Sequence, residues 1–420
     1  MRNRLDRAST KVVKVARDYK KYLSRYGESE ASHYPEPPTT AKFVLVIPAY
    51  QEELGQIEET FTGLKDLLII LVVNSSEPLE KTTQGLLFDI DQCWQLLNEK
   101  RHMRWYETPS QHYVLVVDRC AHPIDRKQGV GKARKIGADI ALRLIETGSV
   151  REPWIFNTDA DADLPRNYLN SFQDEPSIAF QLFPFKHGIE DDLAAALYEF
   201  SLLWYPLGLK FAGSSFAFPS VGSTITCSAD AYAKVRGFPP RSAGEDFYLL
   251  NKLRKVGSFL FVNSDPIGLS SRRSDRVPFG TGPGLRKIDQ LAESLSFPFY
   301  HPNVFGELKI FIDKLKTSQD AENLAKHFDG SLMEEFVLTS QLLPLLDGQK
   351  SQTPKQYQKF IQDWFDGFRT LKFIHLARDQ AYKSVQFPDI WRSEILPFDC
   401  PGTSASSVEQ GTQLAWKALI

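Results

Sequence analysis

Short apolar runs alternate with stretches of helical spacing between Lys42 and about residue 183. The apolar runs show no alternation of inward and outward positions, which is typical of strands whose two faces are both covered. They predict strands over Phe43–Ile47, Leu68–Val73, Tyr113–Val117, Trp154–Asn157 and Ile178–Phe183. The stretches between them predict helices over Gln56–Leu67, Asp89–Lys100 and Lys132–Glu146. Such alternation favours an α/β fold, a doubly wound, mostly parallel sheet flanked by helices that binds ligands at the carboxyl ends of its strands.

The pattern changes beyond about Gly284, where helical spacing replaces the strand signal. Helices are expected over Leu308–Leu315, Leu332–Leu345, Tyr357–Phe368 and Phe373–Tyr382. The last twenty residues are rich in Ser, Thr, Gln and Gly, and we expect a loose tail with one apolar anchor. The aromatic stretch 193–227 is interrupted by charges and prolines before it reaches about 20 apolar residues, so it predicts buried core instead of a membrane span.

The first 26 residues place apolar side chains at steps of three or four and basic side chains on the other face. This pattern predicts an amphipathic helix, either docked on its own globule or in contact with a membrane surface. Residues 28–40 are rich in Ser, Pro and Glu and predict a linker. The basic segment lacks a following apolar region, so it is not expected to be a secretory signal peptide.

The amino-acid composition excludes several classes of protein. The 420 residues are 42% hydrophobic and 24% charged, which excludes collagen, low-complexity disorder and a simple coiled coil. A formal net charge of −2 gives no chain-wide basic footprint for nucleic acid. The four cysteines lie far apart, which favours free thiols and a reducing compartment. We therefore expect a cytoplasmic protein that is not secreted, with peripheral membrane contact through residues 1–26 as an alternative.

The segment after the fourth predicted strand carries carboxylates at alternate positions, Asp159, Asp161 and Asp163. In an extended backbone, residues two apart point to the same side, so these acids repel one another unless a cation is present. Oxygen ligands of this kind suit magnesium, manganese or calcium. An EF-hand would need Gly and Glu where Leu164 and Asn170 stand. The alternative to a metal site is a solvated acidic turn.

A glycine-rich segment, Lys127–Gly137, resembles two phosphate-binding loops without satisfying either pattern. The Walker pattern needs Gly at Arg126 and Ser or Thr after Lys132, and the dinucleotide pattern needs Gly at Arg134. A glycine-rich turn that opens a helix beside basic side chains favours a diphosphate. The alternative is a basic helix start on the surface.

A third segment places Glu245 and Asp246 at the predicted start of a helix, after Gly244. Asp246 borders the apolar side of that helix, and an ionised, partly buried carboxylate is what a general base requires. The alternative is capping by acids in the first turn. A later arginine-rich stretch, 270–282, predicts either a loop that closes over an anionic substrate or an ordinary surface loop. The histidines form no zinc-ligand motif.

Together with Phe43–Glu53, which reads FVLVIPAYQEE, these segments resemble family 2 glycosyltransferases with the GT-A fold over roughly residues 43–284. Phe43–Glu53 is similar to the family's opening strand and nucleotide-binding turn, and Asp159–Asp161 is similar to its D-x-D metal motif. Gly222-Ser223, Ala229–Gly237 and the Glu245-Asp246 pair look like its acceptor side.

The resemblance implies a hexosyltransferase-like enzyme that uses a nucleotide-diphosphate sugar with Mn²⁺ or Mg²⁺ and inverts the anomeric carbon. It makes Asp161 a metal ligand, with Asp159 on the ribose or on the metal through water. It makes Asp246, beside Glu245, the base. The implied donor-binding residues are Pro48, Ala49, Tyr50, Glu52, Asn74, Lys132, Arg134 and Asp159.

Two departures from the family pattern refine this expectation. Asn74 stands where the family commonly has an acidic residue for the base, which weakens a claim of uridine specificity. The Q-x-x-R-W element of processive members is absent, which favours transfer of one sugar per encounter.

Two other functions remain as alternatives to a glycosyltransferase: a nucleotidyltransferase acting on a sugar phosphate, and a non-catalytic nucleotide-sugar-binding protein. The expected regions are 1–40 (helix and linker), 41–284 (GT-A-like catalytic domain) and 285–420 (mainly helical). The expected partners are a nucleotide sugar and an unidentified acceptor, without nucleic acid.

Overall fold

The computed structural model describes residues 19–75, 77–188, 192–278, 280–291, 294–317, 321–328, 331–348, 353–391 and 407–420. The chain divides into two compact units, of which the first comprises Met1–Gly188 and Ser220–Gly280. The second comprises Ile189–Pro219 and Thr281–Ile420. This division differs from the expected catalytic region 41–284, because 189–219 belongs to the second unit.

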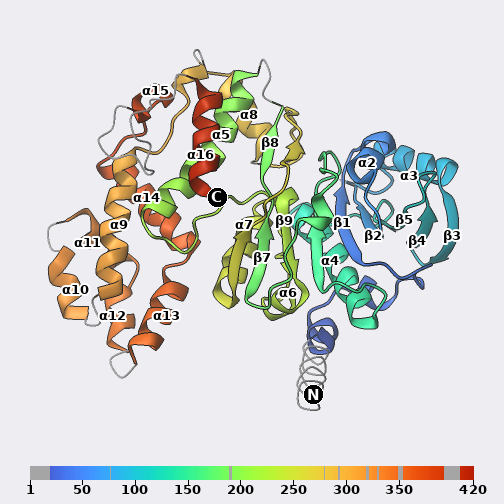
Figure 1. Ribbon diagram of the computed structural model, residues 1–420, viewed down its shortest axis with the longest axis horizontal. Helices are drawn as coiled ribbons and strands as arrows, with labels where there is room; N and C mark the ends of the chain where they lie inside the picture. Colours follow the sequence, from blue (N-terminus) through green and yellow to red (C-terminus); the bar gives the residue numbers. More distant parts are fainter. Residues whose placement is uncertain are drawn as a thin grey trace. The chain divides into compact units, whose positions relative to one another are not determined.

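The first unit is built on a sheet. Its strands are β1 (Phe43–Ala49), β2 (Leu67–Val73), β3 (Gln95–Lys100), β4 (Met103–Glu107), β5 (Tyr113–Asp118), β6 (Trp154–Asn157), β7 (Ile178–Leu182), β9 (Ile225–Ser228) and β10 (Ser258–Phe261). Over the described residues they form a nine-stranded sheet in the order β10-β7-β9-β6-β1-β2-β5-β4-β3 (Figure 1). β4 and β9 run antiparallel to both of their neighbours, whereas the other neighbours pair in parallel. β8 (Phe185–His187) and β11 (Ile267–Leu269) pair separately, in parallel.

Helices cover both faces of this sheet. They are α2 (Leu54–Phe61), α3 (Lys81–Cys93), α4 (Gly129–Thr147), α6 (Ala229–Lys234) and α7 (Glu245–Val256). On one face, Leu45 of β1 shares a buried cluster with Ile57 of α2 and Ile90 of α3. On the other face α4 packs so closely on β1 that a Cβ on Gly137 would overlap the Cγ1 of Val46. The result is a helix–sheet–helix sandwich, consistent with the α/β fold expected from the sequence.

The predicted strands correspond to β1, β2, β5, β6 and β7. The helix expected over Asp89–Lys100 is wrong in its second half, because α3 ends at Cys93 and Gln95–Lys100 forms the edge strand β3. The helix expected over Gln56–Leu67 ends early at Phe61, since the chain turns through Gly63 at a φ of +85° before entering β2. Such a positive φ suits glycine and stops a helix.

The described part of the N-terminal helix, residues 19–25, is docked on the first unit. Tyr22 is 3% exposed, and its hydroxyl donates to Oδ1 of Asp139 at 2.6 Å. Lys135 donates from Nζ to Oδ2 of the same buried carboxylate at 2.7 Å. A buried carboxylate paired in this way anchors the segment to α4. Residues 1–18 of the expected amphipathic helix lie outside the described residues.

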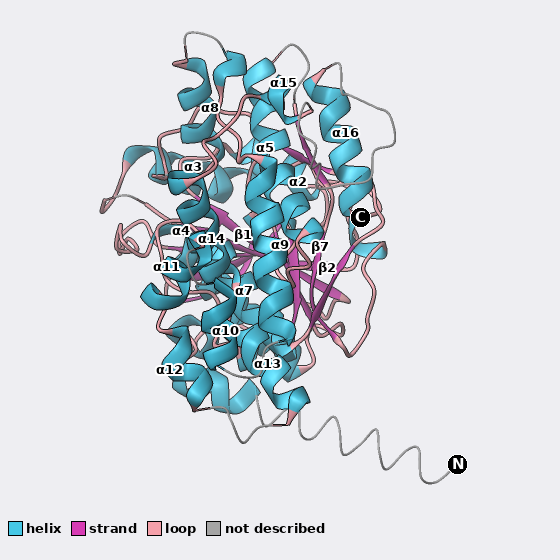
Figure 2. Ribbon diagram, turned by 90° about the vertical axis from the view of Figure 1, so that its left-hand side faces the viewer, coloured by secondary structure: helices cyan, strands magenta, loops and turns pink. Residues whose placement is uncertain are grey.

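The second unit is helical (Figure 2). Its helices are α5 (Leu193–Phe211), α8 (Thr281–Asp289), α9 (Pro302–Thr317), α10 (Ala321–Phe328), α11 (Leu332–Thr339), α12 (Leu342–Asp347), α13 (Pro354–Trp364), α14 (Gly367–Gln380), α15 (Phe387–Ile390) and α16 (Val408–Leu419). Short 3-10 helices occupy Ser29–Ser32, Tyr168–Asn170 and Gly222–Thr224 in the first unit and Ser294–Ser296 in the second. The aromatic core of the second unit includes Phe311 and Phe373, whose stacked rings lie 4.9 Å apart.

The C-terminal segment corrects the expectation of a loose tail. α16 packs along α5, and Lys210 donates from Nζ to the carbonyls of Ala418 and Leu419 at 2.9 and 2.8 Å. A cation at the last carbonyls of a helix satisfies acceptors that have no partner within the helix. Along the part of the chain that the structure describes, no helix combines the length and the apolar character needed to cross a membrane.

Candidate functional site

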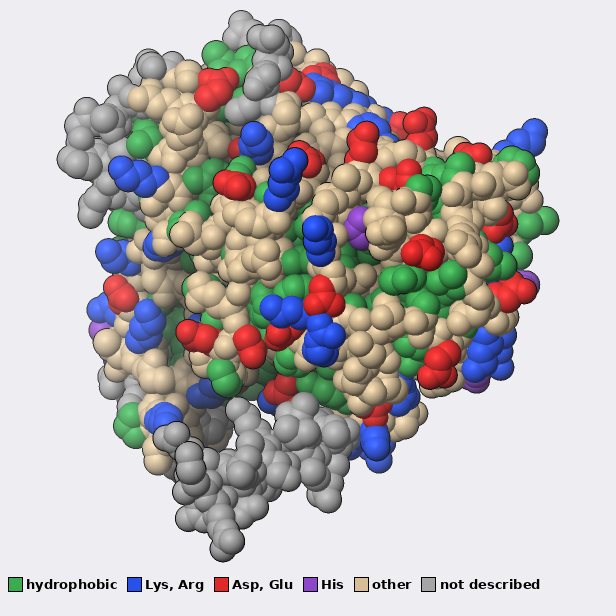
Figure 3. Space-filling model, turned by 45° about the vertical axis from the view of Figure 1, so that its right-hand side comes forward, with side chains coloured by type: hydrophobic (Ala, Val, Ile, Leu, Met, Phe, Trp, Pro, Cys, Tyr) green, Lys and Arg blue, Asp and Glu red, His purple; other side chains and the backbone are tan. Residues whose placement is uncertain are grey.

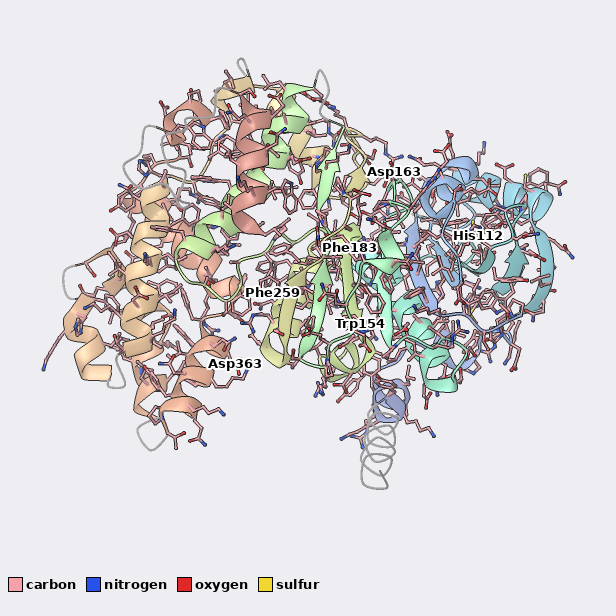
Figure 4. All side chains as sticks on the ribbon, in the orientation of Figure 1. His112, Trp154, Asp163, Phe183, Phe259 and Asp363 are labelled. Carbon is pink, nitrogen blue, oxygen red and sulfur yellow. The ribbon has the colours of Figure 1, made fainter. Side chains whose placement is uncertain are left out.

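The candidate site lies at the carboxyl ends of β1 and β6, which are adjacent and parallel. The Thr158 N–H donates to the Val46 carbonyl at 3.1 Å, so the chain leaves both strands at the same edge of the sheet. Figure 4 labels Trp154 at the start of β6 and Asp163 beyond its end. Ligands of parallel α/β sheets bind at this edge. The turn after β1 and the acidic segment after β6 therefore meet where the sequence predicts a substrate.

Two arginines that follow β11 hold the carboxylates of this edge. Arg272 donates from both terminal nitrogens to the two carboxylate oxygens of Glu52, each at 3.1 Å. Its Nη2 also donates to Oδ2 of Asp161 at 2.9 Å. Arg276 donates from Nη1 to the Tyr50 carbonyl at 2.5 Å and to Oε1 of Glu52. Residues predicted as donor-binding and metal-binding thus lie together, bridged by guanidinium groups.

The carboxylates at this edge crowd one another. Burial raises the pKa of Glu52 to about 7, the charge of Asp161 adds to the rise, and Arg272 opposes it. Burial also raises the pKa of Asp161, with the charge of Asp159 as the next cause. A site with this surplus of negative charge favours cationic partners.

Arg134 of α4 connects the acidic segment to the Glu245-Asp246 pair. It is 2% exposed and donates from Nε to Oε1 of Glu245 at 3.1 Å. Its other nitrogens donate to Oδ1 of Asp159 and, at 3.3 Å, to the Thr158 carbonyl. A Cβ on Gly222 would lie 2.7 Å from Nη2 of Arg134, so the glycine leaves room for the guanidinium. Arg134 therefore fixes two predicted functional segments relative to each other.

Glu245 and Asp246 are the first residues of α7, as expected. Gly244 precedes them at a φ of +71°, a left-handed conformation that glycine adopts without strain. Asp246 is partly buried, and its Oδ1 accepts the Phe247 N–H at 2.7 Å. Burial raises the pKa of Asp246 to about 7, and the neighbouring charge of Glu245 adds to the rise. Burial likewise raises the pKa of Glu245, against the opposing charge of Arg134.

The glycine-rich segment, predicted to favour a diphosphate, contacts the loop that leads into α7. The Gly131 N–H donates to the Arg241 carbonyl at 2.9 Å, so this amide is already used inside the protein. Gly129 has a φ of +38°, and a Cβ added to it would lie 2.8 Å from the Cα of Ser242. The glycines let α4 approach the loop that leads into α7. In this structure the two glycines form a packing contact with the loop that precedes the acidic pair.

Lys132, predicted to lie near the diphosphate, forms an ion pair with the linker. Its Nζ pairs with Oε2 of Glu28 at 2.5 Å. Lys132 and Arg134 are two residues apart on α4 and so point to different sides of the helix. Of the two predicted cations, Arg134 reaches the carboxylates of the site and Lys132 holds the N-terminal linker.

The end of β1 lies beside the end of β2. Pro48 and Ala49 are in register with the last residues of β2, and the Asn74 N–H donates to the Ala49 carbonyl at 2.9 Å. The Asn74 side chain accepts the Ile124 N–H at 3.0 Å. Asn74 therefore orders the turn after β5.

The site residues predicted from the sequence do not include Arg272 and Arg276. The arginine-rich composition of 270–282 did indicate that their loop could close over an anionic substrate.

A steric prediction follows from the packing of α4. Gly131→Ala places a Cβ 2.5 Å from the Pro239 carbonyl oxygen and 2.7 Å from the Arg241 nitrogen and oxygen, all backbone atoms. Because a backbone segment has to move, we expect a loss of about 1–3 kcal/mol of stability. Chemical denaturation measures the change. The control is Gly85→Ala in α3, where the added Cβ meets nothing within 4 Å; equal stability of both variants with the wild type would contradict this packing.

The residues present fit a divalent cation in ligand type. Asp159 and Asp161 offer carboxylate oxygens, which magnesium and manganese prefer. Among the described residues, no three or more His, Cys, Asp or Glu side chains form a group that could hold a metal ion. A magnesium ion commonly uses one or two carboxylates together with substrate phosphates and water. One oxygen of each carboxylate already accepts a hydrogen bond from an arginine: Oδ1 of Asp159 from Arg134 and Oδ2 of Asp161 from Arg272.

Side chains of both signs are intermixed on the face of the molecule in Figure 3, where Lys and Arg lie among Asp and Glu. The formal net charge of the whole chain is −2.

Comparison with protein-family models and with curated proteins gives no match. Among solved structures, the chain is similar to the mannosyltransferase PcManGT from Pyrobaculum calidifontis in complex with GDP-Man and Mn²⁺, at 14% identity and a TM-score of 0.37. That alignment covers 88% of this chain and 94% of the other. It is also similar to S. aureus TarS 1-349 in complex with UDP-GlcNAc, at 12% identity and a TM-score of 0.33, covering 83% of this chain and 95% of the other.

Proposed function

We propose that the first unit is the catalytic unit of a family 2 type glycosyltransferase with the GT-A fold. It would move one sugar from a nucleotide-diphosphate sugar to an acceptor hydroxyl, with inversion and with a divalent cation. The observation that carries the proposal is the meeting of Glu52, Asp161 and the Arg134-linked pair Asp159 and Glu245 at one edge of a mostly parallel sheet. The sequence motifs that resemble this family supply the residues at that edge.

The donor would lie along the end of β1. Pro48, Ala49 and Tyr50 would contact the nucleoside, and the crowded carboxylates would lie on the diphosphate side. Arg272 and Arg276 contact Glu52 at this edge and would neutralise diphosphate oxygens. Guanidinium groups bind phosphate oxygens in a bidentate manner, which orients the group as well as attracting it.

A divalent ion held by Asp161, and by Asp159 directly or through water, would act as a Lewis acid on the leaving diphosphate. Side chains of the protein would orient the groups around this ion. Arg134 holds Asp159 and Glu245 in fixed positions from a buried site, so the acidic segment and the start of α7 keep one geometry. Such preorganisation lowers the reorganisation that charge development would otherwise require.

Asp246 would act as the general base. Its carboxylate takes the proton of the acceptor hydroxyl while the acceptor oxygen forms a bond to the anomeric carbon. The bond between that carbon and the diphosphate oxygen breaks, and its electron pair leaves with the nucleoside diphosphate. Attack on the side opposite the leaving group inverts the anomeric carbon. A carboxylate with a pKa raised to about 7 by burial is well matched to proton abstraction near neutral pH.

A thermal-shift screen of nucleotide sugars with Mn²⁺ tests the proposal. A donor present at roughly 100 times its dissociation constant stabilises the protein by about 2.7 kcal/mol. We expect one nucleotide sugar to shift unfolding more than its free sugar or its nucleoside monophosphate. The absence of a shift with every nucleotide sugar would contradict the proposal.

The raised pKa of Asp246 predicts a pH dependence. The base is active when ionised, so kcat/KM should fall as pH decreases through about 7, by about tenfold for each further pH unit. Because Glu245 interacts with Asp246, the apparent pKa belongs to the pair. Glu245→Gln removes a neighbouring negative charge and should move the acid limb to lower pH. A limb at the same pH in the variant would assign it to another group.

A further inference from the structure

Two arginines of the site share one carboxylate. Arg272 and Arg276 both contact Glu52, whose side chain is 5% exposed, whereas their own side chains are 38% and 22% exposed. The carboxylate is therefore the fixed partner and the guanidinium groups are the accessible ones. Arg272 also contacts Asp161, the predicted metal ligand.

The loop that carries these arginines is tied to the acidic segment at its base. Gly268 of β11 and Asp163 exchange backbone hydrogen bonds at 2.8 and 2.9 Å, and a Cβ on Gly268 would lie 2.9 Å from that of Asp163. The Ser271 hydroxyl donates to the Gly188 carbonyl at 3.1 Å. These contacts hold the start of the loop, so arginines that leave Glu52 stay within reach of the same site.

We propose that Arg272 and Arg276 are internal counter-cations of the carboxylates Glu52 and Asp161, which they exchange for the donor diphosphate when a divalent cation binds. This inference rests on the proposed function. A cation on Oδ2 of Asp161 displaces Nη2 of Arg272 from that oxygen, and the N–H group then needs another acceptor. Diphosphate oxygens supply that acceptor. Metal and diphosphate therefore bind with positive coupling, and each favours the other by the same factor.

Calorimetric titration of the full chain with Mn²⁺ alone, and with Mn²⁺ plus guanosine, uridine or adenosine diphosphate, tests the exchange. In the wild type we expect weak binding of Mn²⁺ alone and about tenfold tighter binding with the matching diphosphate. In Arg272→Gln/Arg276→Gln, Mn²⁺ alone should bind more tightly than in the wild type, while the diphosphate binds more weakly. Mn²⁺ affinity that is unchanged or lower in the double variant would overturn the proposal.

Two further variants keep this test decisive. Arg151→Gln removes an exposed arginine that pairs with Asp66, and it should leave both affinities at wild-type values. Arg272→Lys keeps the charge without the bidentate geometry and should lie between the wild type and the double variant. A wild type that binds no nucleoside diphosphate would contradict the proposed function and the diphosphate half of the exchange. The titration with Mn²⁺ alone would still decide whether the arginines compete for the carboxylates.

Discussion

Asp246→Asn is expected to lower kcat by about 100- to 10,000-fold, the usual contribution of a general base. Asn has nearly the same shape, and its side-chain oxygen can still accept the Phe247 N–H that Oδ1 of Asp246 accepts at 2.7 Å. The start of α7 should therefore keep its structure while the proton acceptor is lost. Steady-state kinetics with the donor found by thermal shift gives kcat, and calorimetry should show donor binding close to that of the wild type.

Asp230→Asn is the matched control for this experiment. Asp230 lies in the first turn of α6, as Asp246 lies in the first turn of α7, and it pairs with Lys234 on the surface. We expect wild-type kcat in this control. Unchanged kcat in Asp246→Asn would remove Asp246 from the role of base, and loss of donor binding in that variant would assign it to the donor side.

Asp161→Ala is expected to reduce kcat/KM by about 100- to 1,000-fold, because it removes the carboxylate that would hold the Lewis acid at the leaving group. The variant should also weaken binding of the donor in the presence of Mn²⁺. Kinetics over a range of Mn²⁺ concentrations measures the first effect, and calorimetry with the donor measures the second.

Asp163→Asn is the control that tests whether the effect of Asp161→Ala is specific to the predicted metal ligand. Asp163 is the third acid of the same segment, but it is exposed, and its backbone pairs with Gly268 of β11. We expect near wild-type kinetics, because this substitution keeps the backbone pairing and changes a side chain outside the arginine network. A larger loss in Asp163→Asn than in Asp161→Ala would show that the wrong carboxylates are assigned to the metal.

The sequence predicts the central strands well because their burial on both faces leaves continuous apolar runs, as in Leu67–Val73. The edge strand Gln95–Lys100 carries no such signal, since its side chains are exposed or half-buried, and its pairing with β4 depends on tertiary structure. The helix α16 was not predicted either, because its segment is polar in composition. Only one face of α16 is buried, where it packs on α5.

The acidic members of the site could be predicted from their positions after strands and at a helix start. Their partners could not be predicted, because each pairing joins distant segments: Arg134 with Glu245, and Arg272 with Glu52. For the glycine-rich segment, the sequence indicated a ligand contact, whereas the structure shows a contact within the protein. Its composition suits a phosphate loop, and only the fold shows that Gly131 donates to the Arg241 backbone.

The central claim is that the site breaks the bond between a sugar and a nucleoside diphosphate. The direct test is to quantify the products of the wild-type protein with Mn²⁺, the donor found by thermal shift, and a set of acceptors that carry free hydroxyl groups. Sugar transfer predicts equal amounts of nucleoside diphosphate and glycosylated acceptor, with the anomeric configuration inverted. No transfer to any acceptor, together with release of pyrophosphate when the protein is instead given a nucleoside triphosphate and a sugar 1-phosphate, would identify a nucleotidyltransferase. A donor that binds without turnover with every acceptor would identify a non-catalytic nucleotide-sugar-binding protein.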